Sequence, residues 1–73
     1  MDEMRSAMGL TPRQLSVAGL VSRGFSNNEV ARELGMSVKT VEYHLVNVFA
    51  RLGVRSRTQL TRRMLEEWAL AKD

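Results

Sequence analysis

The chain has 73 residues, of which 44% are hydrophobic and 26% charged, and it contains no cysteine. This length suits one small domain of a few packed helices, and the absence of cysteine excludes a fold held by disulfides or by a thiolate metal site. The longest apolar run is far shorter than the roughly 20 residues that cross a bilayer, and no signal-peptide pattern opens the sequence. We therefore expect a cytoplasmic domain without a membrane partner.

The net charge of +3 is unevenly distributed along the chain. Residues 1–38 balance four arginines against four acids, residues 39–63 carry six cations against Glu42 alone, and residues 64–73 carry a net −2. A basic segment of this kind indicates a polyanionic partner such as nucleic acid. A merely solvated basic face is the alternative that charge alone leaves open.

Residues 1–9 have no clean hydrophobic periodicity, so we interpret them as a flexible N-terminal tail. Helical periodicity and capping signals fill residues 10–73, and no segment alternates as a half-buried strand would. The pattern predicts an all-α domain, a four-helix bundle that contains a helix-turn-helix.

The first predicted helix begins at Pro12. Thr11 can cap it, Pro12 suits the first helical position, and Gln14 completes a capping box. The helix should end near Arg23 because Gly24 follows.

The next two helices are joined by a turn so short that it indicates a helix-turn-helix over about residues 26–45. Ser26 and Glu29 have the spacing of a second capping box. Gly35 can adopt the positive φ that ends the first helix of the pair, and Ser37 can cap the second. The connector between them has the length and composition typical of this motif.

The helix predicted over residues 38–52 has two unlike faces, since successive residues are about 100° apart. One face is apolar and should be buried: Val41, Leu45, Val48 and Leu52. The other mixes a cation, an amide, a phenol and small apolar groups: Lys39, Thr40, Glu42, Tyr43, Val46, Asn47 and Ala50. Amides can pair with adenine, lysine with guanine or phosphate, and small apolar groups with the thymine methyl. This helix is therefore the predicted recognition helix.

A third capping-box spacing, Ser56 and Gln59, opens a helix predicted over residues 57–70. One apolar stripe of this helix can close the core: Leu60, Met64 and Trp68. A second apolar edge beside it suggests a partner surface. We interpret this helix as a dimerisation helix through Leu65, Trp68 and Ala69. The alternative is that Trp68 folds over the core of its own domain.

These features together resemble the LuxR/GerE-type DNA-binding domain of bacterial transcription regulators. The resemblance covers Leu10 to about Met64 and rests on several correctly spaced elements. They are Leu10-Thr11-Pro12-Arg13, Gly24, Ser26-Asn27, Glu29-Val30-Ala31, Leu34, Ser37, Thr40-Val41, His44-Leu45, Leu52-Gly53-Val54 and Arg57. The resemblance implies a four-helix fold with its third helix in the major groove and its fourth helix often used for dimerisation.

The resemblance also implies the partners and the contact residues. We expect sequence-specific binding to double-stranded DNA, a homodimer at least on DNA, and RNA polymerase as a further candidate partner. The predicted DNA-binding residues are Lys39, Thr40, Glu42, Tyr43, Val46, Asn47, Arg51, Arg55 and Asn27. For Arg57 we expect a structural role, bonding carbonyls or a helix end, because the family keeps arginine there while its DNA targets vary.

Four positions depart from the family pattern. Gln14 and Ala18 stand where glutamate and leucine are usual, Glu42 where lysine is frequent, and Val46 where some members carry a base-contacting lysine. Glu42 cannot bind phosphate but can accept a hydrogen bond from cytosine N4. The docking mode should therefore hold, whereas base preferences should not be transferred.

Two other function classes stay open at this level: a sigma-factor promoter-recognition domain, and a small helical protein-interaction module. An enzyme is not expected, because no nucleophile–base–orienter set exists. His44 has no second ligand at metal spacing, so we interpret it as a packing residue and expect no metal, cofactor or small-molecule ligand. Family members usually carry an N-terminal receiver or ligand-binding domain, so this chain is either a stand-alone regulator or the C-terminal domain of a larger one.

Overall fold

The structure, a computed structural model, describes residues 8–72, and the predicted tail at residues 1–7 lies outside this range. Four helices follow one another: α2 (Pro12–Ser22), α3 (Asn27–Leu34), α4 (Val38–Leu52) and α5 (Arg57–Lys72). The described part of the chain holds helices and turns without a strand, which confirms the predicted all-α class.

Helix α2 begins as its sequence predicts. The Thr11 side chain accepts from the Gln14 N–H at 3.1 Å, and the Gln14 side chain accepts from the Thr11 N–H at 3.0 Å, so the capping box is complete. The helix ends one residue earlier than expected, at Ser22, and Gly24 has φ +96°. The Phe25 N–H then bonds the Leu20 carbonyl at 3.1 Å, which satisfies a carbonyl left free at the helix end.

The helix-turn-helix connector is also built from local signals. Ser26 and Glu29 form the second reciprocal capping box, with bonds of 3.1 and 2.8 Å. Because the Ser26 N–H donates to the carboxylate, the pKa of Glu29 lies below its ordinary value. Gly35 has φ +65° and lets the Met36 N–H reach the Ala31 carbonyl at 3.0 Å. Only glycine adopts this backbone conformation without a steric penalty.

The start of α5 differs from its prediction. The Gln59 N–H donates to Ser56 Oγ at 3.1 Å, which is half of a capping box. The Gln59 side chain does not return this bond to Ser56 and instead accepts from the Arg55 N–H at 2.7 Å. The Gln59 side chain thus reaches one residue further back than in a capping box, and it closes a turn that runs from Arg55 to Gln59.

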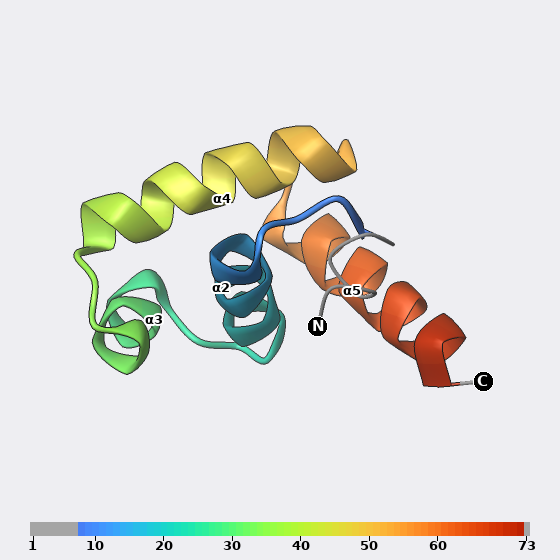
Figure 1. The fold of residues 1–73 in the computed structure, drawn as a ribbon, viewed down its shortest axis with the longest axis horizontal. Helices are drawn as coiled ribbons and strands as arrows, with labels where there is room; N and C mark the ends of the chain where they lie inside the picture. The colour runs from blue at the N-terminus through green and yellow to red at the C-terminus, as the bar shows by residue number, and fades with distance from the viewer. Residues whose placement is uncertain (1–7, 73) are drawn as a thin grey trace.

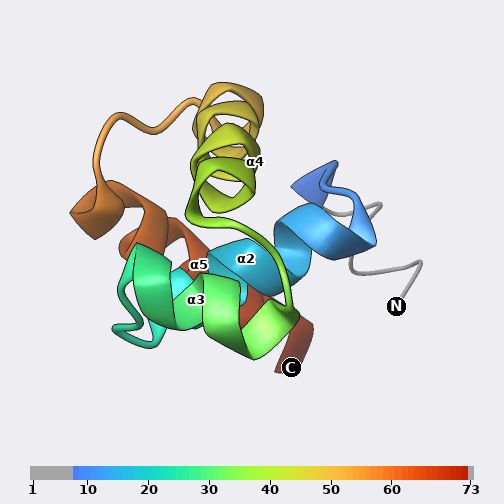
Figure 2. The ribbon, with the colours of Figure 1, turned by 90° about the vertical axis from the view of Figure 1, so that its left-hand side faces the viewer.

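Helix α2 is the centre of the fold, because it packs against α3, α4 and α5, and α3 packs in turn against α4. Figures 1 and 2 show α4 lying along one edge of the molecule, with the other three helices on one side of it. Every element supplies fully buried side chains to a single core: Leu10, Val17, Val30, Val41, Val48 and Leu60. This packing fixes the orientation of α4.

The N-terminal boundary of the domain requires a correction. Met8 and Gly9 were assigned to the tail, yet the Met8 side chain is only 6% exposed and belongs to the core cluster. Leu10, next to them, is fully buried. The tail prediction failed at these two residues because the burial of Met8 depends on packing against the folded domain, which the local sequence does not show.

Candidate nucleic-acid interface

The outer face of α4 is not covered by any described helix (Figures 1 and 2). Its inner face is the expected stripe, since Val41, Leu45, Val48 and Leu52 are all at most 7% exposed. Four buried side chains at helical spacing leave the helix no freedom to rotate about its axis. The residues opposite this stripe therefore face solvent.

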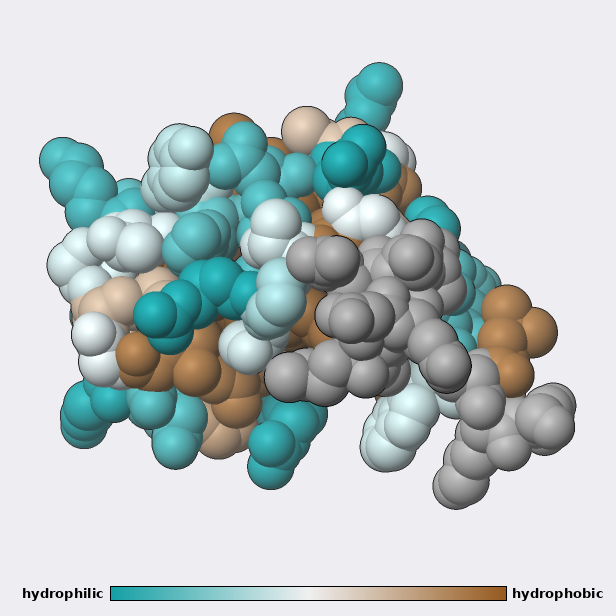
Figure 3. All heavy atoms as spheres, in the orientation of Figure 1, coloured by the Kyte–Doolittle hydropathy of each residue, from teal (hydrophilic) through white to brown (hydrophobic). Residues whose placement is uncertain are grey.

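Of the predicted base-reading residues, Lys39, Glu42, Tyr43 and Val46 are exposed, while Asn47 is half-buried at the side of the face. Tyr43 and Val46 expose 66% and 67% of their surface and stand one helical turn apart on this face. Figure 3 shows polar and apolar groups mixed along the edge occupied by α4. Apolar groups exposed without a partner in the chain are typical of a contact surface.

The first turn of α4 carries a small hydroxyl network. The Thr40 N–H donates to Ser37 Oγ at 3.0 Å, and the two hydroxyl oxygens lie 2.9 Å apart. When Ser37 donates in that pair, the Thr40 hydroxyl hydrogen remains available to an external acceptor. Unpaired backbone N–H groups at this helix end favour an anion such as phosphate.

The cations of the basic segment differ in how far they are bonded within the domain. Arg57 is exposed, yet both ends of its guanidinium are bonded: Nη1 donates to Asn27 Oδ1 and Nη2 to the Phe25 carbonyl, both at 2.9 Å, which confirms its expected structural role. Arg63 is half-buried and donates to the Leu52 carbonyl at 3.2 Å and to Glu67 at 3.3 Å.

The other four cations of this segment are exposed: Lys39, Arg51, Arg55 and Arg62. Lys39 and Arg55 are exposed, and their side chains form no hydrogen bond or ion pair with the described residues. Arg51 is exposed as well, but its Nε donates to the Gly9 carbonyl at 2.8 Å. Arg57 occupies the side-chain oxygen of Asn27, and the amide nitrogen of Asn27 forms no hydrogen bond with the described residues.

His44 is half-buried, and its Nδ1 is buried without a hydrogen-bond partner among the described groups. Its ring lies 5.8 Å from that of Tyr43, centre to centre. Within residues 8–72, no group of three or more His, Cys, Asp or Glu side chains is arranged to hold a metal ion. None of the helices in this range is both long and apolar enough to cross a membrane.

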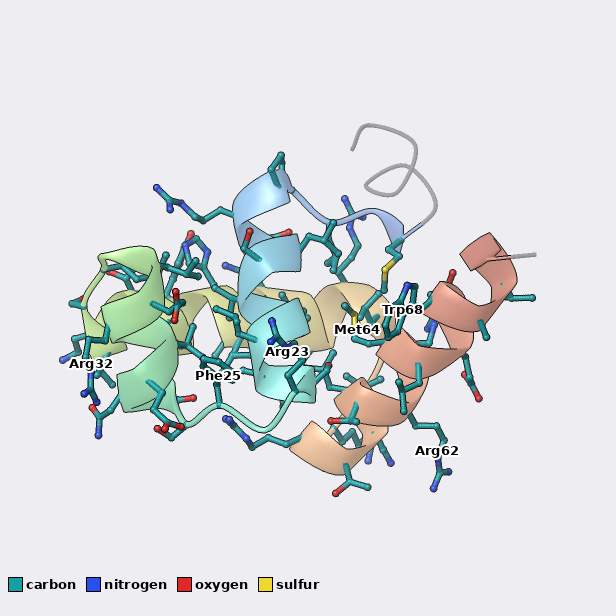
Figure 4. The ribbon with its side chains drawn as sticks, turned by 90° about the horizontal axis from the view of Figure 1, so that it is seen from below. Arg23, Phe25, Arg32, Arg62, Met64 and Trp68 are labelled. Atoms are coloured by element: carbon teal, nitrogen blue, oxygen red, sulfur yellow. The ribbon has the colours of Figure 1, made fainter. Side chains whose placement is uncertain are left out.

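Helix α5 carries the predicted dimerisation residues on two sides. A shallow hollow is lined by Thr58, Thr61, Arg62, Leu65, Glu66 and Ala69. Leu65 is 54% exposed and Trp68 60%, so both side chains present more than half of their surface to solvent. Figure 4 shows Trp68 on the same side of α5 as the half-buried Met64, whereas Arg62 points away from both. Trp68 therefore lies beside the hollow and does not line it.

This geometry is that of a helix-turn-helix domain, with α3 and α4 joined by the short turn at Gly35. The chain matches the family described as "Bacterial regulatory proteins, luxR family" over residues 8–64. It belongs to this family, whose members are transcription regulators and not enzymes, and membership implies DNA binding through the helix-turn-helix.

The chain is similar to several larger regulators. It is 49% identical over 51 residues to a protein of Mycobacterium tuberculosis named as an HTH-type transcriptional regulator, covering 70% of this chain and 6% of that protein. It is 42% identical over 59 residues to the transcriptional regulatory protein UhpA of Escherichia coli, covering 81% of this chain and 30% of UhpA. It is 38% identical over 63 residues to the oxygen regulatory protein NreC of Staphylococcus aureus, covering 86% and 27%. The chain thus spans less than a third of each of these relatives.

The sequence did not predict that the Gly9 carbonyl accepts a hydrogen bond from Arg51. The glycine was placed in the tail, although it stands between two apolar residues, Met8 and Leu10. That arrangement is the one available signal that the segment packs, and it does not reveal the distant Arg51 as the partner.

Proposed function

We propose that this chain binds double-stranded DNA sequence-specifically, with α4 inserted in the major groove. The observation that carries the proposal is the uncovered outer face of α4, on which Tyr43 and Val46 are two-thirds exposed beside Lys39. A recognition helix needs such a mixture, because hydrogen-bonding groups and apolar groups read different base edges. Glu42 and Asn47 stand on either flank of this face.

Phosphate contacts in this proposal come from cations and from a helix end. Lys39 and Arg55 are outward and unpaired among the described side chains, and Thr40 stands where α4 presents free N–H groups. Arg51 and the Asn27 amide nitrogen complete the set. Such contacts fix the position of a protein on the duplex, and they make the affinity depend on salt.

We further propose that two copies of the chain bind DNA as a dimer and contact each other through α5. The exposed Leu65 and the hollow that it shares with Ala69 support a contact between copies, with Trp68 at its border. A two-fold pair of recognition helices requires an operator that is an imperfect palindrome. As part of a bacterial regulator of the kind represented by UhpA and NreC, the domain would act in the cytoplasm and contact RNA polymerase.

The test is selection of bound sequences from a random duplex pool, followed by affinity measurements on the selected site and on a scrambled duplex. Sequence-specific recognition predicts an enriched, partly palindromic motif and at least tenfold tighter binding to it. Equal affinity for both duplexes would contradict base reading. Absence of salt-sensitive DNA binding would favour the protein-interaction module instead, whose basic face would bind an acidic protein.

A further inference from the structure

The segment that enters the domain is fastened to the last turn of α4. Met8 and Leu10 are buried in the core at 6% and 0% exposure. Gly9 lies between these anchors, and its carbonyl accepts a hydrogen bond from Arg51 Nε at 2.8 Å, across 42 positions of the sequence. The segment and the recognition helix are therefore joined both by packing and by a charge-assisted hydrogen bond.

Glycine is favoured at this junction both by its backbone conformation and by the space around it. Gly9 has φ +72°, and a Cβ atom added to it would lie 3.2 Å from Arg51 Nε and 3.4 Å from Arg51 Cδ. The Arg51 side chain thus lies directly against the backbone of Gly9. The other glycines with positive φ, at positions 24, 35 and 53, have no atom within 4 Å of the corresponding point. Gly9 is distinguished from them by this close approach.

The bond leaves most of the Arg51 guanidinium available. It uses one of the five N–H donors of an arginine, and the Nη1 and Nη2 groups make no hydrogen bond to the described residues. Arg51 remains exposed, on the flank of α4 that also carries Asn47 one turn earlier. A guanidinium held in this way can present two parallel donors to a phosphate.

We propose that Gly9 positions Arg51 for a DNA backbone phosphate, so that residues 8–10 set part of the affinity of α4 for DNA. The inference rests on the proposed DNA binding. With Nε fixed by the Gly9 carbonyl, Arg51 loses less side-chain freedom on binding a phosphate, and the contact is correspondingly tighter. Movement of residues 8–10 away from α4 releases Arg51 and weakens binding without changing any DNA-contacting residue.

A double-mutant cycle on the whole chain separates positioning from charge. Arg51→Ala removes a cation, so it should lower the affinity and flatten the salt dependence by about one unit of log–log slope. Gly9→Ala keeps the cation, so it should lower the affinity about two- to tenfold with an unchanged slope. In the Arg51→Ala background, Gly9→Ala should have no further effect. Additive losses would overturn the inference while leaving DNA binding intact.

The matched control is Gly24→Ala, which places alanine at φ +96° with nothing within 4 Å. It should reduce stability as Gly9→Ala does but leave the DNA affinity unchanged, and an equal loss of affinity in both would contradict the proposal.

Without DNA, the Arg51 Nε–H should exchange with water more slowly than that of Arg55, as measured by NMR. Equal exchange would overturn this inference alone, whereas absence of DNA binding by the unsubstituted chain would end the proposed function and this inference with it.

Discussion

The Arg57 guanidinium donates a hydrogen bond of 2.9 Å to the side-chain oxygen of Asn27, 30 positions earlier in the chain. The same group bonds the Phe25 carbonyl, so one side chain ties the start of α5 to the start of α3. Because α3 packs against α4, this link holds the helix-turn-helix in place from the side opposite the uncovered face.

Removal of this link should destabilise the domain. Arg57→Ala is expected to cost about 1–2 kcal/mol of unfolding free energy in urea, because two charge-assisted hydrogen bonds are lost at a partly solvated site. Arg57→Lys should recover little, since an ammonium group lacks the planar fork that reaches both acceptors. Arg62→Ala is the control, because Arg62 is exposed like Arg57 but its side chain forms no hydrogen bond or ion pair with the described residues. Unchanged stability of Arg57→Ala would contradict the structural role.

Helix ends could be predicted from sequence because their signals are local. Ser26 and Glu29 form the capping box within a single turn, and the same holds for Thr11 and Gln14. Arg51 shows the limit of this reasoning. Its bond to Gly9 spans 42 positions, and only the packing of the whole chain brings the two together.

The functions of individual arginines could not be predicted for the same reason. The sequence shows a basic segment, but whether a cation faces outward depends on which carbonyl the fold brings to it. Arg63 bonds the Leu52 carbonyl and Glu67, whereas Arg55 has no such partner among the described side chains. The structural role of Arg57 was predicted, and that prediction came from the family resemblance and not from its spacing.

Base reading is tested at Asn47. Replacing Asn47 by Ala should cost roughly 1–3 kcal/mol of binding free energy on the selected site and little on a scrambled duplex, because the lost hydrogen bonds are specific to one base. Glu33→Ala, an exposed residue of α3, serves as control. Equal losses on both duplexes would show that Asn47 contacts the backbone or only supports the fold.

Cations of the basic segment that are bonded within the domain should affect the salt dependence of DNA affinity less than cations that are not. Lys39→Ala and Arg55→Ala should each flatten the log–log dependence of affinity on salt by about one unit, since each removes one phosphate contact. Arg63→Ala should leave the slope nearly unchanged and lower stability instead, because its guanidinium is occupied within the domain. If Arg63→Ala lowers the slope by a full unit, Arg63 must exchange its bonds within the domain for a phosphate contact when DNA binds.

The capping box of α3 makes stability depend on pH. The Ser26 N–H donates to the Glu29 carboxylate and lowers the pKa of Glu29 below its ordinary value of 4.5. The carboxylate therefore contributes stability that is present above about pH 4.5 and is lost as the pH falls through the lower folded-state pKa. Glu29→Gln keeps the hydrogen bond, as Gln14 does in α2, but does not titrate. In urea unfolding, the advantage of the unsubstituted chain over Glu29→Gln should shrink below pH 4.5; a constant difference would contradict this account.

The contact between copies is tested on α5. Leu65 and Trp68 are 54% and 60% exposed, so Leu65→Glu and Trp68→Glu should leave the helical circular dichroism nearly intact. Each should abolish cooperative occupation of two half-sites about one helical turn apart, because a charge then meets the apolar surface of the other copy. The surface is small, so dimers should form fully only on DNA. Leu70→Glu is the matched control, since Leu70 is 71% exposed but lies two residues beyond Trp68 and thus faces elsewhere on the helix. If Leu70→Glu abolishes cooperativity while Leu65→Glu and Trp68→Glu preserve it, the contact between copies lies on the other side of α5. If Trp68→Glu unfolds the domain, Trp68 supports the core through Met64.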